Sequence, residues 1–323
     1  MEPAVQFSMW SDVPADPWLV LGAVAIEAAV GYPDRLHRRA PHPVVWIGGL
    51  IVWCDKTWNR DDGSPQARRV LGVATLIVIM TVAGATGWLP SLTPQPFALG
   101  LVLLVGTLGL AQRSLFDHVR AVAKALTAGD IGAAQLAVGA IVGRDVAELD
   151  EAGVAAAALE SLAESFNDGV VAPIFWFVVG GLPGLFIYKA VNTADSLIGH
   201  RESRWRDFGW ASARMDDLMN LFPARIAGCL IASAGIGGWR VMARDASKHA
   251  SPNSGWPEAA MAGALKIQLG GCASYDGVTT ERPTFGNGMR PRASDFERGL
   301  KVYVRACGLL WLLLAMGGLA WPR

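Results

Sequence analysis

The chain has 323 residues, of which 52% are apolar and only 17% charged, and its 28 basic residues balance its 28 acidic ones. A net charge of zero gives no electrostatic footprint for nucleic acid, so nucleic acid is not expected as a partner. Because several stretches of about 15–20 residues carry almost no charge, the composition predicts an all-α, polytopic integral membrane protein. Strands are not expected at membrane depth, since no alternating pattern repeats as a transmembrane barrel requires.

The apolar runs of the first half predict the following helices. A first helix is expected over residues 17–31, retained in the mature protein, and the basic loop 32–69 after it is placed in the cytoplasm by the positive-inside rule. Residues 70–89 form the clearest membrane span, and residues 96–110 are predicted to return across the membrane. The amphipathic stretch 112–169 is expected to form cytoplasmic helices.

The second half contains a helix breaker inside an apolar run. Residues 173–188 are interrupted by Gly180-Gly181-Leu182-Pro183-Gly184. A full crossing would place the arginine-rich loop after this run outside, against the charge rule. The pattern therefore predicts a re-entrant hairpin, since irregular backbone at membrane depth is tolerated where it lines a cavity in the protein. Residues 223–239 fit either a span or a buried core helix, and residues 302–321 predict the final span.

These elements predict a helical bundle with a re-entrant hairpin and cytoplasmic-side helical loops. We expect a single membrane-embedded helical domain over residues 1–323, in a plasma (inner) membrane. Its site is expected on the cytoplasmic side, built from loops 32–69, 112–217 and 240–301.

Candidate chemistry concentrates between Glu160 and Asp217. Glu160 and Glu164 are four residues apart, and Asn167 and Asp168 follow at helical spacing, which predicts one shared polar face. Lys189, Asn192 and Asp195 describe a second face, and a charged turn with Arg206, Arg214, Asp216 and Asp217 follows. Such faces are solvated surfaces in most soluble proteins. In a strongly apolar chain, ionisable groups near membrane depth are costly enough to favour a functional site.

Other motifs give weaker signals. His42 stands in a predicted loop between two prolines, where a structural role and a functional one are both open. Asp150 predicts a helix start, and so do Asn253 and Ser254. The free backbone N–H groups of the second start could hold a phosphate, although Glu258 would compete for the same positive end. Gly270-Gly271 is expected to stop that helix.

Several site classes are excluded or disfavoured. No GxxxxGK[ST], HExxH, GxSxG or GxGxxG motif occurs, so a P-loop and these other recognisable sites are excluded. The four cysteines are scattered without a CxxC pair, which favours ordinary thiols over a disulfide framework or a zinc site.

Taken together, the motifs resemble one family, the CobD/CbiB membrane enzymes, the adenosylcobinamide-phosphate synthases of cobalamin biosynthesis. The resemblance covers most of the chain, in the family's order. It rests on HPVVWIG (42–48), GRDVAELD (143–150), ESLAESFNDGVVAPIFW (160–176), YKAVNTADSLIGHRESRWRDFGWASARMDDLMNLFPAR (188–225) and SPNSGWPEAAMAGAL (251–265). One departure is Phe166, which stands where a small polar residue is expected.

This resemblance implies ATP-dependent amide-bond formation. A carboxylate of adenosylcobyric acid would be joined to the amine of (R)-1-aminopropan-2-ol O-phosphate, or of a related amino-alcohol phosphate, to give adenosylcobinamide phosphate. The implied cofactors are ATP and Mg²⁺, because phosphoryl transfer to a carboxylate gathers negative charges that cations must neutralise. The implied partners are the corrinoid, the amino-alcohol phosphate and the lipid bilayer. A homo-oligomer and a complex with other corrinoid-pathway enzymes both stay open.

The resemblance carries over matching positions as candidate site residues. The expected catalytic residues are Glu160, Glu164, Asp168, Lys189 and Asp195. The expected substrate-binding residues are His42, Asn167, Asn192, Arg206, Arg214, Asn253, Trp256 and Glu258. Arginine suits phosphate because its donors bind in pairs. The expected ligands of Mg²⁺, which prefers a few carboxylates with water and phosphate oxygens, are Glu164, Asp168, Asp216 and Asp217.

Two alternatives belong to other classes. A membrane transporter or permease would line a substrate pathway with these polar faces, but it predicts inverted repeats, and none is seen in the sequence. A non-catalytic relative with the same fold should have lost several of the carboxylates and cations together, and this chain keeps them.

Overall fold

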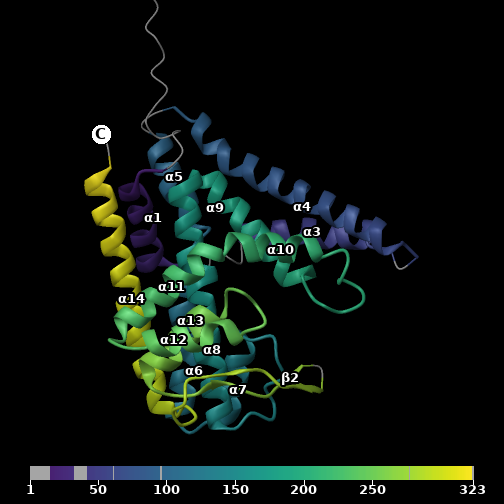
Figure 1. Cartoon of the computed structure of the whole chain (residues 1–323). Coiled ribbons are helices and arrows are strands. Elements are labelled where there is room, and N and C mark those ends of the chain that lie inside the picture. Colours follow the sequence, from purple (N-terminus) through teal and green to yellow (C-terminus); the bar gives the residue numbers. More distant parts are fainter. Residues whose placement is uncertain (1–14, 33–41, 61, 95–96, 276, 322–323) are drawn as a thin grey trace, which may run out of the picture. The chain divides into compact units, whose positions relative to one another are not determined.

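The computed structural model describes residues 15–32, 42–60, 62–94, 97–275 and 277–321. Among these residues, helices joined by short turns make up most of the structure, and four short strands are confined to the segment before the last helix (Figure 1). The all-α prediction is confirmed.

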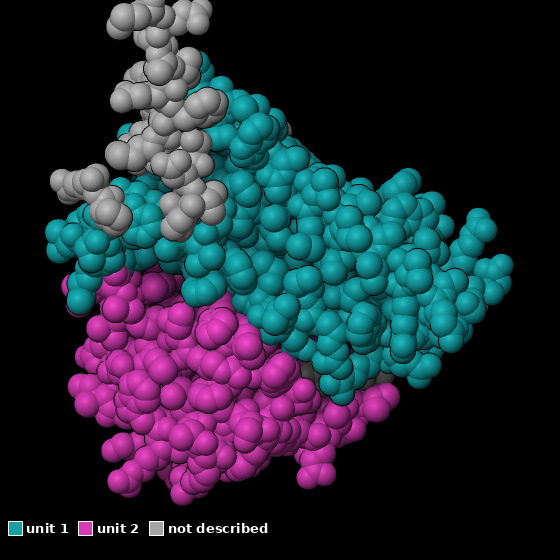
Figure 2. Space-filling view, turned by 45° about the horizontal axis from the view of Figure 1, so that its top comes forward, with its two compact units in different colours: residues 1–111, 172–219, 314–323 teal, residues 112–171, 220–313 magenta. Residues whose placement is uncertain are grey.

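The chain divides into two compact units, which Figure 2 colours separately. Unit 1 comprises Met1–Ala111, Ala172–Met219 and Leu314–Arg323, and unit 2 comprises Gln112–Val171 and Asn220–Leu313. Each unit therefore draws on segments that are distant in sequence. The prediction of a single domain over residues 1–323 stays a prediction.

Within the described residues, four helical segments are long and apolar enough to cross a membrane. They are Pro65–Leu92, Phe97–Thr127, Glu151–Ile198 and Ala293–Ala320, and Pro17–Val30 and Leu221–Ala234 are shorter apolar helices. The first, second and fourth contain most or all of the runs 70–89, 96–110 and 302–321 that the sequence marked as spans. The polytopic membrane prediction is confirmed, and the orientation of the spans stays a prediction.

Unit 1 is built on long apolar helices whose starts are capped by local side chains. Pro65 occupies the first turn of its helix, and the Ser64 hydroxyl accepts the Ala67 N–H at 3.2 Å. The core of the unit gathers buried side chains such as Ile79, Tyr188 and Phe208. The elements are α1 (Pro17–Val30), α3 (Pro43–Trp58), α4 (Pro65–Trp88), η1 (Leu89–Leu92), α5 (Phe97–Thr107), α9 (Ala172–Ile198) and α10 (Trp210–Met219).

The predicted helix break in the apolar run is confirmed as a sharp turn inside α9. Gly181 has φ 61° and ψ −159°, a conformation open only to glycine, and it divides α9 into two helical parts. The two parts approach each other closely after the turn, as shown by the position of Gly184, where an added Cβ would lie only 2.5 Å from the Trp176 carbonyl oxygen. A straight helix would separate these two residues by about 12 Å. Whether the turn lies within the bilayer as a re-entrant hairpin stays a prediction.

Unit 2 contains the amphipathic helices predicted for 112–169 and most of the C-terminal third. Asp150 caps the predicted helix start by accepting the Gly153 N–H at 2.7 Å. The core includes Leu159, Phe166 and Phe296. The elements are α6 (Gln112–Thr127), α7 (Ile131–Gly139), α8 (Glu151–Phe166), η2 (Asn167–Val171), α11 (Leu221–Ala234), α12 (Trp239–Asp245), η3 (Ala246–Lys248), α13 (Gly255–Leu265), β1 (Leu269–Gly270), β2 (Ala273–Tyr275), β3 (Val278–Thr280), β4 (Thr284–Phe285) and α14 (Ala293–Ala320), whose end passes into unit 1.

Three local predictions need correction. The predicted loop 32–69 contains the helix α3, and His42 is its N-cap, with Nδ1 accepting the Val44 N–H at 3.3 Å. Helix α13 does not run on to Gly270-Gly271, because Lys266 already ends it in the left-handed conformation at φ 57°. Gly270 instead belongs to β1 of a small sheet, in which β1 pairs antiparallel with β4, and Gly271 follows directly after that strand.

The shared polar face predicted for residues 160–168 also changes. Residues Asn167–Val171 form a π-helical turn, so the α-helical spacing ends at Phe166. Phe166, where a small polar residue was expected, is 1% exposed and meets the Tyr303 ring edge-on at 5.6 Å. The π turn therefore begins directly after a core aromatic, and Asn167 is buried instead of following a solvated face.

Candidate active site

The most enclosed charge cluster of unit 2 surrounds Glu160 on α8. Its Oε2 accepts from a guanidinium nitrogen of Arg144 and from one of Arg282, each at 2.7 Å, and its Oε1 accepts the Gly270 N–H at 2.7 Å. The carboxyl is 4% exposed and the Arg144 side chain 9%. Two cations against one carboxylate leave a net charge of +1, so the cluster can attract a further anion.

A small cavity of about 310 Å³ adjoins this cluster. Its lining includes Arg144, Arg290 and the backbone of Gly270 and Gly271, with Cys272 exposed at its side. Because two guanidinium groups line a cavity of this size, it suits a carboxylate or phosphate group.

Glu258 on α13 is a buried carboxyl of a different kind. Its side chain is 4% exposed, its Oε2 has no hydrogen-bond partner among the described residues, and its Oε1 lies 3.6 Å from Nε2 of His249. Burial raises the pKa of Glu258 well above its usual range, and the nearby Glu164 and Glu160 carboxylates raise this pKa further. Burial also lowers the pKa of His249. The raised pKa of Glu258 and the lowered pKa of His249 bring the proton affinities of the two neighbouring groups closer together, as in an acid–base pair.

Helix α8, the π turn and the start of α13 bring further predicted residues into unit 2. Glu164 accepts from the Ser254 hydroxyl at 3.0 Å, and one amide nitrogen, Nδ2 of Asn167, donates both to Asn220 at 2.8 Å and to Asp168 at 2.7 Å. The Asn167 Oδ1 is buried without a hydrogen-bond partner among the described residues. A buried acceptor of this kind calls for a hydrogen-bond donor beyond those that the described residues supply.

Arg225 links the remaining two predicted residues of unit 2. Its guanidinium lies over the Trp256 ring at 4.8 Å from the centroid and donates to Oδ1 of Asn253 at 3.3 Å. The arginine thereby fixes the segment that enters α13, where the sequence predicted a phosphate-binding helix start.

Unit 1 holds the second polar series in a looser line. The Lys189 Nζ lies 3.5 Å from Oδ1 of Asn192, whose Nδ2 lies 3.3 Å from Oδ1 of Asp216. Arg214 contacts Asp217 at 3.3 Å, and burial raises the pKa of Asp217 against the opposing effects of Arg214 and Arg201. These side chains are half-buried or exposed, so their contacts are weaker than those of Glu160.

The remaining predicted residues of unit 1 lie on either side of this line. Asp195 follows on α9 and is half-buried, whereas Arg206 is exposed in the turn before α10.

An apolar cavity of about 510 Å³ in unit 1 joins two predicted residues that are far apart in sequence. His42, at the start of α3, and Lys189, on α9, both line it, among apolar side chains from α3, α4, α5 and α9. An apolar cavity with a few convergent polar groups is the usual form of a small-molecule site.

The predicted metal ligands are divided between the two units. Glu164 and Asp168 belong to unit 2, and Asp216 and Asp217 to unit 1. Among the described residues, no three His, Cys, Asp or Glu side chains are placed to hold a metal ion together. A site that uses all four carboxylates stays a prediction, and Mg²⁺ carried by a nucleotide needs only one or two protein carboxylates.

Comparison with known proteins gives consistent matches. The family described as CobD/Cbib protein matches residues 20–303. The chain belongs to the CobD/CbiB family. A relative from Rhodobacter capsulatus is 49% identical over 313 residues, which cover 94% of this chain and 98% of the relative. Relatives from a Sinorhizobium species and from Rhizobium meliloti are 46% and 43% identical over 305 and 311 residues, covering 89% and 92% of this chain and 94% and 95% of theirs. All three are described as cobalamin biosynthesis protein CobD, and no solved structure matches the chain.

In this CobD/CbiB chain, sequence reasoning missed the partners of Glu160. The sequence identifies Arg144 only as part of the GRDVAELD motif, without a partner, and Arg282 carries no signal, because it lies 122 residues from Glu160 in a segment without helical periodicity. His249 was missed as the neighbour of Glu258 because the two belong to different elements, His249 at the end of η3 and Glu258 in α13, so no helical spacing relates them. A buried helical glutamate does signal that cations must come from elsewhere in the chain, but it does not identify them.

Proposed function

We propose that this chain catalyses ATP-dependent amide-bond formation in cobalamin biosynthesis. It would join a carboxylate of adenosylcobyric acid to the amine of (R)-1-aminopropan-2-ol O-phosphate, or of a related amino-alcohol phosphate. The observation that carries the proposal is the similarity, over nearly the whole chain, to relatives described as cobalamin biosynthesis protein CobD. The specific reaction is the one implied by the resemblance of the sequence motifs to those of the family.

The chemistry proceeds in two steps. A carboxylate oxygen of the corrinoid attacks the γ-phosphorus of ATP, which forms an acyl phosphate and releases ADP. The amine then attacks the acyl carbon, the amide C–N bond forms, and inorganic phosphate leaves. The amine enters as an ammonium group, so one proton must be removed before or during the second step.

Unit 2 offers groups suited to these tasks. Glu258 and His249 can accept the proton, because burial raises the pKa of Glu258 and lowers that of His249, and Glu258 Oε2 is not engaged by another described residue. Arg144 can hold an anionic group at the 310 Å³ cavity, with Glu160 keeping its guanidinium in place. Glu164, which acts electrostatically on Glu258, is an alternative acceptor for the proton.

The other predicted roles remain part of the proposal. Lys189, Arg206 and Arg214 would hold phosphate groups, and Asn192 would orient substrate. ATP would bring its own Mg²⁺, which neutralises phosphate charge when bound, held by no more than one or two of the predicted carboxylates. The protein would act in the plasma (inner) membrane with its site facing the cytoplasm, where ATP is available.

A product assay tests the proposal. The purified full-length chain in detergent is mixed with adenosylcobyric acid, aminopropanol phosphate, ATP and Mg²⁺, and the products are identified by mass spectrometry. Formation of adenosylcobinamide phosphate, and its loss in both Glu258→Gln and Lys189→Ala, is expected. Product from both variants would keep the reaction and discard these site residues. A folded wild-type chain that forms no product and consumes no ATP would contradict the proposal and favour the transporter.

A further inference from the structure

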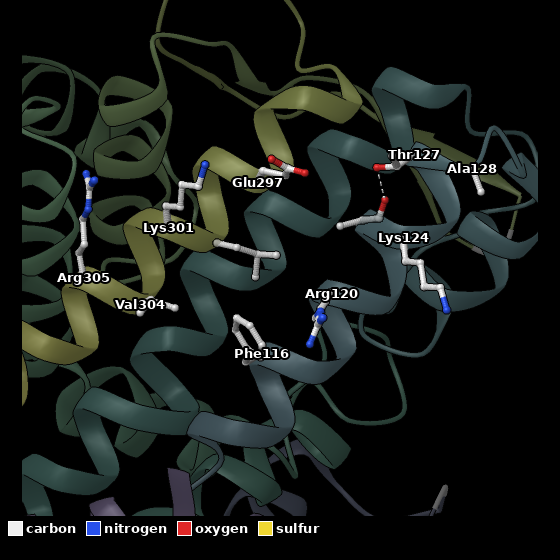
Figure 3. Close-up of a pocket in the computed structure, with 11 residues that line it drawn as sticks. Phe116, Arg120, Lys124, Thr127, Ala128, Glu297, Lys301, Val304 and Arg305 are labelled. Carbon is white, nitrogen blue, oxygen red and sulfur yellow. Dashed lines mark hydrogen bonds between the residues drawn. The ribbon is translucent and has the colours of Figure 1, made fainter. Parts of the chain in front are cut away.

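A basic groove lies in unit 2, away from the clusters described above. It has a volume of about 750 Å³ and runs between α6 and α14 (Figure 3). Arg120 and Lys124 stand on α6, Lys301 and Arg305 stand on α14, and Phe116 lies between the two helices. The remaining lining residues are Ala123, Thr127, Ala128, Glu297, Leu300 and Val304.

The groove carries an uncompensated positive charge. Four cations face one carboxylate, Glu297, so the lining has a net charge of +3 (four minus one). Within the part of the chain that the structure describes, none of the four cations forms an ion pair, and Arg120 alone has a ring contact, at 6.0 Å from the Phe116 centroid. All four are exposed. Like charges gathered in this way repel one another, so a bound anion would relieve the repulsion.

The groove also continues into apolar helix surface. Its floor includes Phe116, Leu300 and Val304, and Val304 is 53% exposed. Farther along α14, Leu312 and Leu313 are 55% and 51% exposed. Helix α14 is apolar and long enough to span a membrane. Its cations lie toward the N-terminal end and its exposed leucines farther along, which is the order in which a spanning helix meets the lipid headgroups and then the hydrocarbon.

We propose that the basic groove between α6 and α14 binds an anionic diacyl phospholipid, whose phosphodiester is attracted by the combined positive charge of Lys301, Arg305, Arg120 and Lys124. The acyl chains would lie along the exposed apolar surface of α14. Basic pockets between membrane helices on the cytoplasmic side are suited to such headgroups, because charge attraction and apolar burial act on one ligand. A soluble anion would use the four cations but leave Val304 and Leu312 uncovered.

The test is lipid binding to the full-length chain. Phosphatidylglycerol or phosphatidylcholine is titrated into the purified protein in detergent, and bound lipid is counted by native mass spectrometry. The double variant Lys301→Gln/Arg305→Gln is compared with Arg240→Gln/Lys266→Gln, which removes two exposed cations outside the groove. The conservative pair Lys301→Arg/Arg305→Lys keeps the charges. Glycerol 3-phosphate is then added as a competitor to separate a lipid from a free phosphate.

Binding of phosphatidylglycerol should weaken about 25-fold in the groove variant, which lacks two cations, because each membrane-surface cation contributes roughly a factor of five to anionic-lipid affinity. It should stay near the wild-type value in the control and conservative pairs, with phosphatidylcholine binding weakly throughout. Equal losses in the groove and control variants would overturn the proposal, and so would no loss in the groove variant. Displacement of phosphatidylglycerol by equimolar glycerol 3-phosphate would assign the groove to a soluble anion and overturn the lipid.

Discussion

The two units hold their polar residues in different ways. In unit 2, Glu160 is buried and receives three short hydrogen bonds from three separate segments of the chain. In unit 1, Lys189 and Asn192 are half-buried and linked by contacts of 3.3–3.5 Å to neighbours on α9 and α10. The comparison teaches that polar residues at helical spacing can form either a buried cluster with short hydrogen bonds or a half-buried cluster with longer ones. Glu160 forms the buried cluster because two arginines distant in sequence, Arg144 and Arg282, pack against it.

The largest expected effect breaks the buried cluster. Glu160→Gln leaves Arg144 and Arg282 without their carboxylate, and removal of one partner from a buried ion pair costs about 3–5 kcal/mol. The free energy of unfolding, measured by denaturant titration in detergent, should fall by about that amount. The double variant Glu160→Leu/Arg144→Met serves as the control and should lose less than the sum of the single changes. An additive loss would mean that the two side chains do not act as a pair.

The second prediction concerns proton transfer at Glu258. If this carboxyl accepts the ammonium proton, Glu258→Gln should lower the rate of amide formation about 100-fold or more, the usual contribution of a general base. Since burial raises the pKa of Glu258, the wild-type rate should rise with pH above the ordinary value of 4.5, as the carboxyl loses its proton. The variant should lack this rise. An unchanged pH profile in the variant would remove Glu258 from the mechanism.

Glu258 also predicts a pH dependence of stability. The folded state binds this proton more tightly than the unfolded state, so the contribution of Glu258 to stability is complete below pH 4.5 and falls as the pH rises toward the raised pKa. The free energy of unfolding of the wild type should therefore fall relative to that of Glu258→Gln as the pH rises above 4.5. A constant difference between the two proteins from pH 4 to pH 8 would contradict the raised pKa.

A smaller effect is expected at the turn in α9. Gly181→Ala forces a side chain into a backbone conformation suited to glycine and should cost about 1–3 kcal/mol of unfolding free energy. Gly180→Ala is the matched control, because a Cβ at Gly180 would meet nothing within 4 Å. Equal stability of the two variants would show that the positive φ at Gly181 is not required.

The smallest effect should come from the looser cluster. Asn192→Ala removes hydrogen bonds of 3.3–3.5 Å at a half-buried site, so the loss of unfolding free energy should stay below about 1 kcal/mol. Substrate binding can still weaken if Asn192 orients the ligand. A stability loss equal to that of Glu160→Gln would remove the distinction between the two clusters.

Much of the fold was predictable from local physics. The uncharged run of α4, the cap at Asp150 and the glycine-rich break in α9 each act within a few residues, so composition and spacing identified them. The π turn after Phe166 was not predictable, because its backbone depends on what packs around it. The helix α3 was missed because charged and Gly residues surround it in a stretch that was interpreted as a loop.

Only those parts of the candidate site that lie within a single helix were predictable from the sequence. Glu160 and Glu164 were identified from their four-residue spacing, and both act electrostatically on Glu258. The contact of Glu160 with Arg282, and the shared cavity of His42 and Lys189, join residues more than a hundred positions apart. Helical periodicity describes one element at a time, so such pairings require the tertiary structure.

A π-helical turn closes its hydrogen bonds over five residues instead of four, so Asn167–Val171 holds one residue more than an α-helical turn of similar length. Deletion of one codon in this turn can therefore convert it into an α-helical turn. The side chains before and after the turn would keep their orientation relative to each other. Elsewhere in α8 the same deletion would rotate every later side chain by about 100°. The loss would not be neutral, because Asn167 would turn away from Asn220 and its buried amide would lose that partner.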